Sequence, residues 1–252
     1  MTKSQRHDDI LELLDQESTL KVNDLANELK VTDMTIRRDL QELEDKNLLI
    51  RVHGGARKVE KDSLSFLELS HRQKREINPD EKNEIAKLIA RNINDHEIVF
   101  LGSGSTIELV YDYLDVNYAK ILTNSIHIFN KFKYDDRFEL ILTGGSYRSK
   151  TGSFTGTIAN DFMNTINVEK SFIGVNAINN QSIFNANEDE GVLQRIILNN
   201  TKKKYIVADH LKFDKLDFYK FYDLSNLDYL ITDSKLSQEL KEKYSKLIDI
   251  IN

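Results

Sequence analysis

Apolar side chains recur at helical spacing in three short segments at the start of the chain. Residues 5–16 and 22–29 each place their apolar side chains on one face of a helix, and Ile36, Leu40 and Leu43 repeat that pattern further along. We therefore predict three helices. The third has one face that packs and an opposite face that is free to contact a partner.

The third helix is followed by a pattern typical of a β-hairpin. Thr32 is a good N-cap for that helix because its hydroxyl can accept a backbone N–H. After Asn47 the sequence changes to an apolar run over residues 48–53, which predicts a strand. The chain then turns at residues 54–55 and returns through residues 56–57. Three helices followed by a two-stranded wing indicate a winged helix-turn-helix domain.

Short apolar strands alternate with helical stretches from residue 97 onwards. This alternation is typical of a mostly parallel sheet that is covered by helices on both faces. The predicted fold is therefore an α/β main domain preceded by a small winged helix-turn-helix domain. The predicted strands lie at residues 98–101, 120–122, 139–142, 170–175, 205–208, 229–232 and 248–251.

A charged segment without a sustained apolar face separates these two regions, and it is predicted to be a linker. The chain contains one proline, and the residues around it predict the start of a helix. Asn78 would be the N-cap, Pro79 the first helical residue, and Glu81 would close a capping box. The predicted parts are the winged helix-turn-helix domain at residues 1–57, the linker at residues 58–78 and the main domain at residues 79–252.

The exposed face of the third helix and the wing carry side chains suited to DNA. Arg37 and Arg38 can fork onto guanine edges in a major groove, while their neighbours reach phosphates or a minor groove. The alternative is that both arginines pair with Asp33, Asp39 or Glu42 as solvated helix charges. The candidate DNA-binding residues are Thr35, Arg37, Arg38, Gln41, Arg51, His53 and Arg57.

Composition narrows the class of protein. The 252 residues include no cysteine, which excludes disulfides, a thiol nucleophile and Cys-ligated zinc. The net charge of −6 argues against a non-specific nucleic-acid coat, but not against a specific binder with locally arranged cations. No segment resembles a signal peptide or approaches the roughly 18 apolar residues of a membrane span. We expect a cytoplasmic protein whose DNA affinity depends on a dimer or a larger assembly.

Polar and glycine-rich loops follow several predicted strands, at the edge of the sheet where ligands bind in such folds. Residues 102–106 read Gly-Ser-Gly-Ser-Thr and lead into a helix, so hydroxyls and backbone N–H groups there can hold a phosphate. Residues 123–125, 143–145 and 176–177 add a polar rim. The loop lacks the features of a Walker A motif or a dinucleotide fingerprint. The alternative is an ordinary strand-to-helix turn with helix-capping neighbours.

Several motifs are more specific than periodicity. D-M-T-I-R-R-D-L at residues 33–40, H-G-G-A at residues 53–56, G-S-G-S-T, S-F-T-G-T-I-A and A-D-H-L-K-F together resemble the DeoR family of bacterial sugar-responsive transcription repressors. The resemblance covers the whole chain. It implies an effector domain similar in fold to ribose-5-phosphate isomerase. It also implies a homo-oligomer, a dimer or tetramer, that leaves its operator DNA when a sugar phosphate binds.

The resemblance further implies an effector site with no catalytic residue, cofactor or metal ion. The loop at residues 102–106 would hold the phosphate near Lys212, and other polar residues would address sugar hydroxyls. Asp209 would fix the loop that bears Lys212 or, alternatively, reach the ligand itself. H-G-G-A-R and A-D-H resemble a subgroup that controls lactose or galactose use. That subgroup implies tagatose 6-phosphate or another ketose phosphate as effector. The candidate effector-binding residues are Gly102, Ser103, Gly104, Ser105, Thr106, Asn124, Gly145, Asp189, Glu190 and Lys212.

Two other functions fit the same residues. Glu190 with Lys212 or Lys203 would be the minimum equipment for proton transfer in an aldose–ketose isomerase. Acidic residues at a helix start are more often partners of the helix dipole, and the attached DNA-binding domain favours a sensor without turnover. The second of these functions is a DNA-binding protein whose second domain only oligomerises. In that case no small molecule alters DNA binding.

Overall fold

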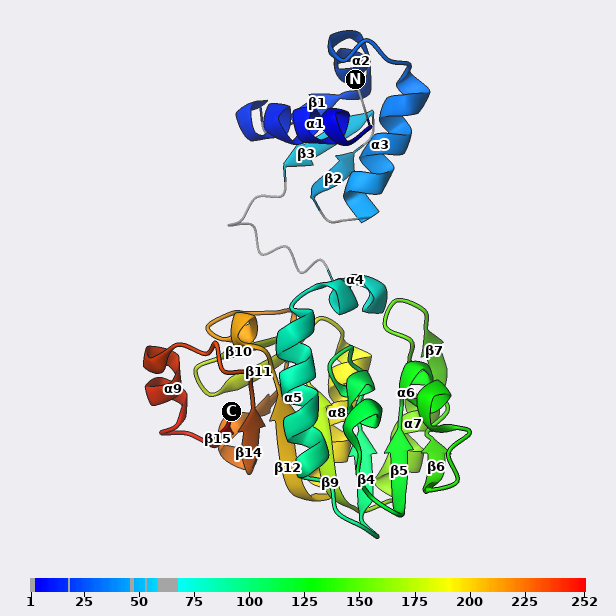
Figure 1. The fold of residues 1–252 in the computed structure, drawn as a ribbon, viewed down its shortest axis with the longest axis vertical. Helices are drawn as coiled ribbons and strands as arrows, with labels where there is room; N and C mark the ends of the chain where they lie inside the picture. Colours follow the sequence, from blue (N-terminus) through cyan, green and yellow to red (C-terminus); the bar gives the residue numbers. More distant parts are fainter. Residues whose placement is uncertain (1–2, 18, 46–47, 53, 59–67) are drawn as a thin grey trace. The chain divides into compact units, whose positions relative to one another are not determined.

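The computed structural model describes residues 3–17, 19–45, 48–52, 54–58 and 68–252. The chain divides into two compact units, Met1–Ser65 and Phe66–Asn252, and each is described by itself (Figure 1). The second unit thus begins before residue 79, where composition placed its start. The reason is that the predicted linker includes helix α4 (His71–Glu76), whose first N–H donates to the Lys150 carbonyl at 2.8 Å.

The first unit contains three helices and a small antiparallel sheet, which confirms the predicted helix-turn-helix arrangement. The sheet order β1-β3-β2 corrects the prediction of a two-stranded wing, because a third strand pairs with the hairpin. Gly55 permits that pairing, since a Cβ there would lie 2.0 Å from the Leu20 carbonyl oxygen. The elements are α1 (Lys3–Glu17), β1 (Thr19–Lys21), α2 (Val22–Glu28), α3 (Asp33–Asp45), β2 (Leu49–Val52) and β3 (Gly55–Lys58).

Apolar side chains from all three helices and the sheet form the core of the first unit. Ile36 and Leu40 are fully buried and Leu43 is nearly so, as their helical spacing predicts. Thr32 caps α3 as expected, because its hydroxyl accepts the Thr35 N–H at 3.3 Å. The packed face of α3 is therefore fixed, and its other face is left for contacts outside the unit.

A seven-stranded parallel sheet forms the centre of the second unit (Figure 1). Its strand order is β15-β14-β12-β9-β4-β5-β6. The apolar runs predicted all seven strands, with bounds shifted by a few residues at most, so the α/β main domain is confirmed. The strands are β4 (Ile98–Leu101), β5 (Ala119–Thr123), β6 (Phe138–Leu142), β9 (Val168–Gly174), β12 (Thr201–Val207), β14 (Tyr229–Ile231) and β15 (Asp249–Ile251).

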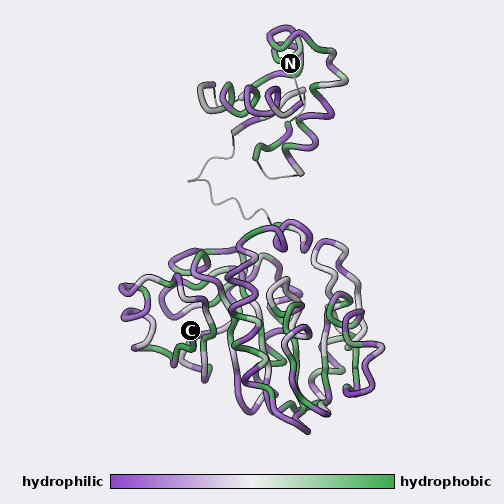
Figure 2. Tube along the Cα trace, in the orientation of Figure 1, coloured by the Kyte–Doolittle hydropathy of each residue, from purple (hydrophilic) through white to green (hydrophobic). Residues whose placement is uncertain are grey.

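Successive side chains of a strand point to opposite faces of the sheet. Because the side chains on both faces are apolar here, helices cover both faces. Phe100 packs in one core cluster, whereas Val99 and Leu101 pack in the other. Apolar residues recur through the central strands, while α4 is hydrophilic (Figure 2). The face of Val99 packs against α5 (Pro79–Arg91), the 3₁₀ helix η1 (Ile107–Tyr113) and α6 (Ile126–Phe132), and that of Phe100 against α7 (Thr157–Asn164) and α8 (Glu188–Asn199).

Smaller elements complete the second unit. An antiparallel three-stranded sheet consists of β10 (Ala177–Asn179), β11 (Ser182–Asn185) and β13 (Tyr219–Asp223). A hairpin joins β7 (Ser146–Arg148) to β8 (Ser153–Thr155). The remaining helices are the 3₁₀ turns η2 (His210–Lys212) and η3 (Leu224–Asn226), and α9 (Gln238–Tyr244).

The start of α5 differs from the prediction. Pro79 occupies the first turn as expected, but Asn78 has a φ of +50° and its side chain makes no capping hydrogen bond. An N-cap residue aims its side chain at the first turn from an extended backbone, which the left-handed conformation of Asn78 does not provide. Glu81 forms an ion pair with Lys235 and does not close a capping box.

Candidate functional sites

The exposed face of α3 presents two arginine side chains. Arg37 and Arg38 are both exposed, and neither forms an ion pair with another residue that the structure describes. Two of the acidic residues considered as their partners are engaged elsewhere. Asp39 accepts from Nε and Nη2 of Arg6 at 2.5 and 3.0 Å, and Glu42 pairs with a lysine of α1 at 2.5 Å. The guanidinium groups of α3 are therefore available to an external acceptor.

Two further candidate DNA-binding residues contact each other between α3 and the wing. The Arg51 guanidinium donates to the side-chain oxygen of Gln41, and the Arg51 backbone N–H donates to Oε1 of Glu44 at 2.9 Å. These bonds hold the Arg51 side chain against α3. Arg57 is exposed on β3. His53, the remaining wing candidate, lies outside the described residues.

The N-terminal part of α3 adds a polar and an apolar group to this surface. The hydroxyls of Thr35 and Thr32 are 3.0 Å apart. Met34 is 75 % exposed, and the sequence analysis did not select it. Both α3 and the wing contribute to one hollow, which is lined by Val22, Arg37, Leu40, Arg51, Val52, Gly54 and Gly55.

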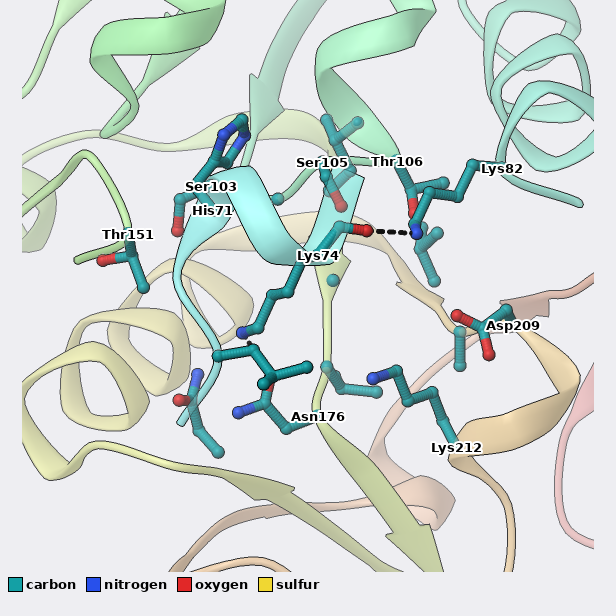
Figure 3. Close-up of a pocket in the computed structure, with 18 of the residues that line it drawn as sticks. His71, Lys74, Lys82, Ser103, Ser105, Thr106, Thr151, Asn176, Asp209 and Lys212 are labelled. Carbon is teal, nitrogen blue, oxygen red and sulfur yellow. Dashed lines mark hydrogen bonds between the residues drawn. The ribbon is translucent and has the colours of Figure 1, made fainter. Parts of the chain in front are cut away.

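The second unit contains a pocket at the carboxyl ends of the central strands (Figure 3). Loops after β4, β9 and β12 line it, together with α4 and the start of α5. The strand order reverses direction between β4 and β9, since β5 and β6 extend to one side and β12, β14 and β15 to the other. Such a reversal leaves a crevice between neighbouring loops, which is where ligands bind in open parallel sheets.

Four residues of the predicted phosphate loop line the pocket, namely Ser103, Gly104, Ser105 and Thr106. Gly102 lies just outside it and packs against β9, with its N–H donating to the Phe172 carbonyl at 2.9 Å. Hydroxyls and backbone groups of the loop therefore face the pocket. A loop of this kind is suited to hold an anionic oxygen cluster.

Three other candidates are not among the lining residues. Asn124 is 3 % exposed, and its Oδ1 accepts the Ser103 N–H at 3.0 Å, so it holds the loop in place. Gly145 has a φ of +112°, and a Cβ there would lie 2.5 Å from the Thr155 carbonyl oxygen, so it serves the turn before β7. Asp189 is exposed in the first turn of α8.

Three lysines surround the pocket (Figure 3). Lys82 donates to the Lys74 carbonyl at 2.5 Å and to the Ile77 carbonyl, while Nζ of Lys74 donates to Oδ1 of Asn176 at 3.1 Å. Burial and the nearby ammonium of Lys212 lower the pKa of Lys74. Burial, with a smaller effect of Lys212, lowers the pKa of Lys82 to about 8. Such neighbouring cations repel one another, and a bound anion would relieve the repulsion.

The opposite side of the pocket carries a carboxylate. Oε1 of Glu190 accepts from the hydroxyls of Thr151 and Ser153 at 2.5 and 2.6 Å, and it lies 2.8 Å from Nη1 of Arg148. These contacts all involve Oε1, and they fix the position of the Glu190 carboxylate. Lys212, the last candidate, lies in η2 and faces the pocket from the β12 side.

Asp209 holds the loop that bears Lys212, as the sequence resemblance implied. Its Oδ1 accepts the Leu211 N–H at 3.0 Å, and its carbonyl oxygen accepts the Lys212 N–H at 3.0 Å. Asp209 also lines the pocket.

Sequence reasoning missed several lining residues, chiefly His71, Lys74 and Lys82. His71 and Lys74 were assigned to a linker. Lys82 lies in the charged first turn of α5, where lysines are usually solvated. His71 stacks on His127 with ring centroids 3.8 Å apart, and its Nε2 is 3.2 Å from Oε2 of Glu108. Asn176 belongs to the predicted polar rim, but neither Asn176 nor Thr151 was selected as a ligand.

Among the described residues, no three or more His, Asp or Glu side chains are grouped so that they could hold a metal ion. No helix in the same residues is both long enough and apolar enough to cross a membrane.

Known structures resemble this chain at low TM-scores. Ribose 5-phosphate isomerase A from Methanocaldococcus jannaschii shares 16 % identity at a TM-score of 0.38, covering 55 % of this chain and 56 % of the isomerase. An eIF-2B translation initiation factor from Pyrococcus horikoshii reaches a TM-score of 0.43 with 13 % identity, covering 91 % of this chain and 82 % of the factor. Matches with TM-scores below 0.5 add nothing to the assignment of the sites.

Sequence comparison gives a full-length match. Lactose phosphotransferase system repressors from Streptococcus mutans and Lactococcus lactis are 35 % and 36 % identical to this chain, covering all of it and at least 99 % of each relative. The DeoR-like helix-turn-helix domain model matches residues 6–62, and the DeoR C-terminal sensor domain model matches residues 77–234. The chain therefore belongs to the DeoR family, with a helix-turn-helix domain for DNA followed by a sensor domain.

Proposed function

We propose that this DeoR-family protein represses a sugar-utilisation operon, for lactose or galactose, and leaves its operator when a phosphorylated sugar binds the sensor domain. The observation that carries the proposal is the pocket at the strand-order reversal, where a Gly-Ser loop faces three lysines. Cations, hydroxyls and backbone N–H groups are the donors that a phosphate requires. The two DNA-facing elements of the first unit supply the operator contacts.

The operator surface consists of α3 and the wing. Arg37 and Arg38 would read guanine edges, and Thr35 and Gln41 would add base or phosphate contacts. Arg51, His53 and Arg57 would lie along the backbone or a minor groove. Because the net charge of the chain is −6, affinity would come from a homo-oligomer that engages two half-sites.

The effector would lie with its phosphate between the loop at residues 102–106 and the lysines, and with its sugar towards Glu190 and Asn176. Glu190 can accept hydrogen bonds from sugar hydroxyls, and Asn176 can both donate and accept. The relatives named as lactose phosphotransferase system repressors support tagatose 6-phosphate as the first compound to test. Asn124, Gly102 and Gly145 would act by shaping the loops, and Asp189 would remain outside.

Release follows from linkage. An effector that binds more tightly to the free repressor than to the operator-bound repressor weakens DNA binding by that difference, typically about 1–3 kcal/mol per coupled site. The coupling is reciprocal, so operator DNA must weaken effector binding by the same factor. Measuring both affinities, each with and without the other ligand, tests this equality directly.

An isomerase is the second candidate, and the contacts of its proposed base disfavour it. One oxygen of Glu190 is engaged by two hydroxyls and Arg148, which stabilise a fixed carboxylate. Lys203 is exposed on β12 and is not a lining residue, so it cannot assist at the pocket. Sustained conversion of ribose 5-phosphate or a ketohexose phosphate by the purified protein would support the enzyme instead.

The thermal stability of the purified protein should rise with one ketose phosphate and not with the free sugar. A ligand at about 100 times its dissociation constant adds about 2.7 kcal/mol to the unfolding free energy. Lys212→Met should reduce that gain to about 1 kcal/mol or less, because a hydrogen bond to a charged group contributes about 1.5–3 kcal/mol. Lys203→Met is the matched control and should behave as wild type. No shift with any sugar phosphate would favour the alternative in which the second domain only oligomerises.

Effector affinity should depend on pH because Lys74 and Lys82 at the pocket have lowered pKa values. Above about pH 6 the phosphate is a dianion. With the pKa of Lys82 at about 8, its ammonium loses charge in the free protein as the pH rises through that value. A bound dianion raises that pKa, so binding takes up a proton above pH 8 and affinity should fall by up to about tenfold per pH unit. Calorimetric titrations from pH 6 to 10 measure this, and constant affinity up to pH 9 would contradict it.

A further inference from the structure

Residues 68–77 are the part of the second unit from which the chain continues toward the DNA-binding domain. They form a short, well-defined structure and not an extended strap. Ser70 caps α4, with a reciprocal capping box to Gln73. The His71 N–H donates to the Lys150 carbonyl, and the His71 ring is buried. This segment is therefore seated on the sensor domain, and it also contributes side chains to the pocket.

One end of the segment is tied to the carboxylate side of the pocket. Glu68 forms a two-pronged pair with Arg148, with Nη1 to Oε1 at 3.2 Å and Nη2 to Oε2 at 2.8 Å. Nη1 of the same arginine is 2.8 Å from Oε1 of Glu190, which lines the pocket. Arg148 thus joins a pocket carboxylate directly to the first described residue after the inter-domain region. Charge-assisted pairs of this geometry are strong and directional.

The other end of the segment is tied to the cationic side of the pocket. Nζ of Lys82 donates to the carbonyls of Lys74 and Ile77, the last of which is the C-cap of α4 (Figure 3). Nζ of Lys74 reaches from α4 to Asn176 at the strand end of β9. Both ammonium groups face the pocket, so the groups that would hold a phosphate are also the groups that hold α4.

We propose that residues 68–77 transmit the occupancy of the pocket to the DNA-binding domain, with Arg148 as the positioning residue that couples Glu190 to Glu68. The inference rests on the proposed function and adds the route of regulation. A bound phosphate offsets the repulsion among Lys74, Lys82 and Lys212, and so holds α4 more firmly against the sensor domain. Sugar hydroxyls on Glu190 act on the same segment at its other end.

Hydrogen exchange of the full-length protein tests the first half of this inference. Amides of residues 69–77 should exchange at least about fivefold more slowly with saturating tagatose 6-phosphate, or with whichever sugar phosphate raises the melting temperature. The free sugar should leave their exchange unchanged. A compound that raises the melting temperature and releases the operator, yet leaves these amides unchanged, would overturn the inference.

Glu68→Ala tests the second half, since Glu68 is not among the residues that line the pocket and Arg148 keeps its partner Glu190. The variant should bind operator and sugar phosphate with wild-type affinity, but the effector-induced weakening of operator binding, typically about 5- to 150-fold, should fall by at least about fivefold. Glu97→Ala is the matched control. Glu97 is also ion-paired, but it directly precedes the amino end of β4, whereas the pocket lies at the carboxyl end. If the effector still releases Glu68→Ala fully from the operator, the inference is wrong but the proposed function stands. A flat melting temperature with every sugar phosphate would defeat the proposed function, and the inference with it.

Discussion

Replacing Arg37 and Arg38 together by alanine should lower operator affinity by at least about 2 kcal/mol, because each bidentate contact to a guanine contributes about 1–3 kcal/mol. Neither guanidinium is paired with another described residue. Their removal therefore breaks no ion pair within the described protein, and the loss belongs to the DNA complex. The folded structure of the first unit should be unaffected, since both side chains are exposed.

Fluorescence anisotropy with operator and non-operator duplexes at two salt concentrations separates the possible roles of the two arginines. Replacing an arginine that reads a base should lower the ratio of specific to non-specific affinity. Replacing one that contacts a phosphate should reduce the slope of the salt dependence by about one unit. Arg195→Ala, which removes an exposed arginine of α8, is the control for net charge. Wild-type affinity in the double variant would remove α3 as the recognition helix.

The central sheet could be predicted from sequence because its strands are apolar on both faces. Each of the seven runs is bounded by polar or glycine-rich residues, so its position in the chain is unambiguous. The strands that were missed pair at the periphery. β1 has three residues, and its single buried side chain, Leu20, forms no pattern. Its pairing depends on the close approach that Gly55 permits, which is a tertiary property.

The candidate site was predictable where it is contiguous in sequence. Residues 103–106 form one loop after one strand, and the rule that ligands bind at carboxyl strand ends places them. Lys74 and Lys82 could not be found in this way, because lysines in charged helical sequences are usually solvated. Only the packing of α4 on the sensor domain brings Lys74 to the pocket and supplies the carbonyls to which Lys82 donates. Asn124, which the resemblance assigns to the effector, accepts the Ser103 N–H and is not among the residues that line the pocket.

The second large effect should come from Asp39, which ties the recognition helix to α1. Asp39 is 1 % exposed, and besides Arg6 it contacts Nε2 of His7 at 3.2 Å. These partners hold the pKa of Asp39 below its usual value, although burial alone would raise it. The stability from this lowered pKa is therefore present above the ordinary pKa and is lost as the pH falls through the lowered value.

Asp39→Ala should destabilise the first unit by about 3–5 kcal/mol, because it leaves the Arg6 guanidinium largely buried without its carboxylate. Glu42→Ala on the same helix is the matched control and should leave the stability of the first unit nearly unchanged, since its partner Lys3 is more than half exposed. Hydrogen exchange of α1 and α3 measures both effects, and the exchange of the central sheet should not change. Equal protection in the two variants would mean that core packing alone orients α3. Loss of exchange protection in Asp39→Ala alone would mean that a buried ion pair holds the recognition helix in the position that DNA requires.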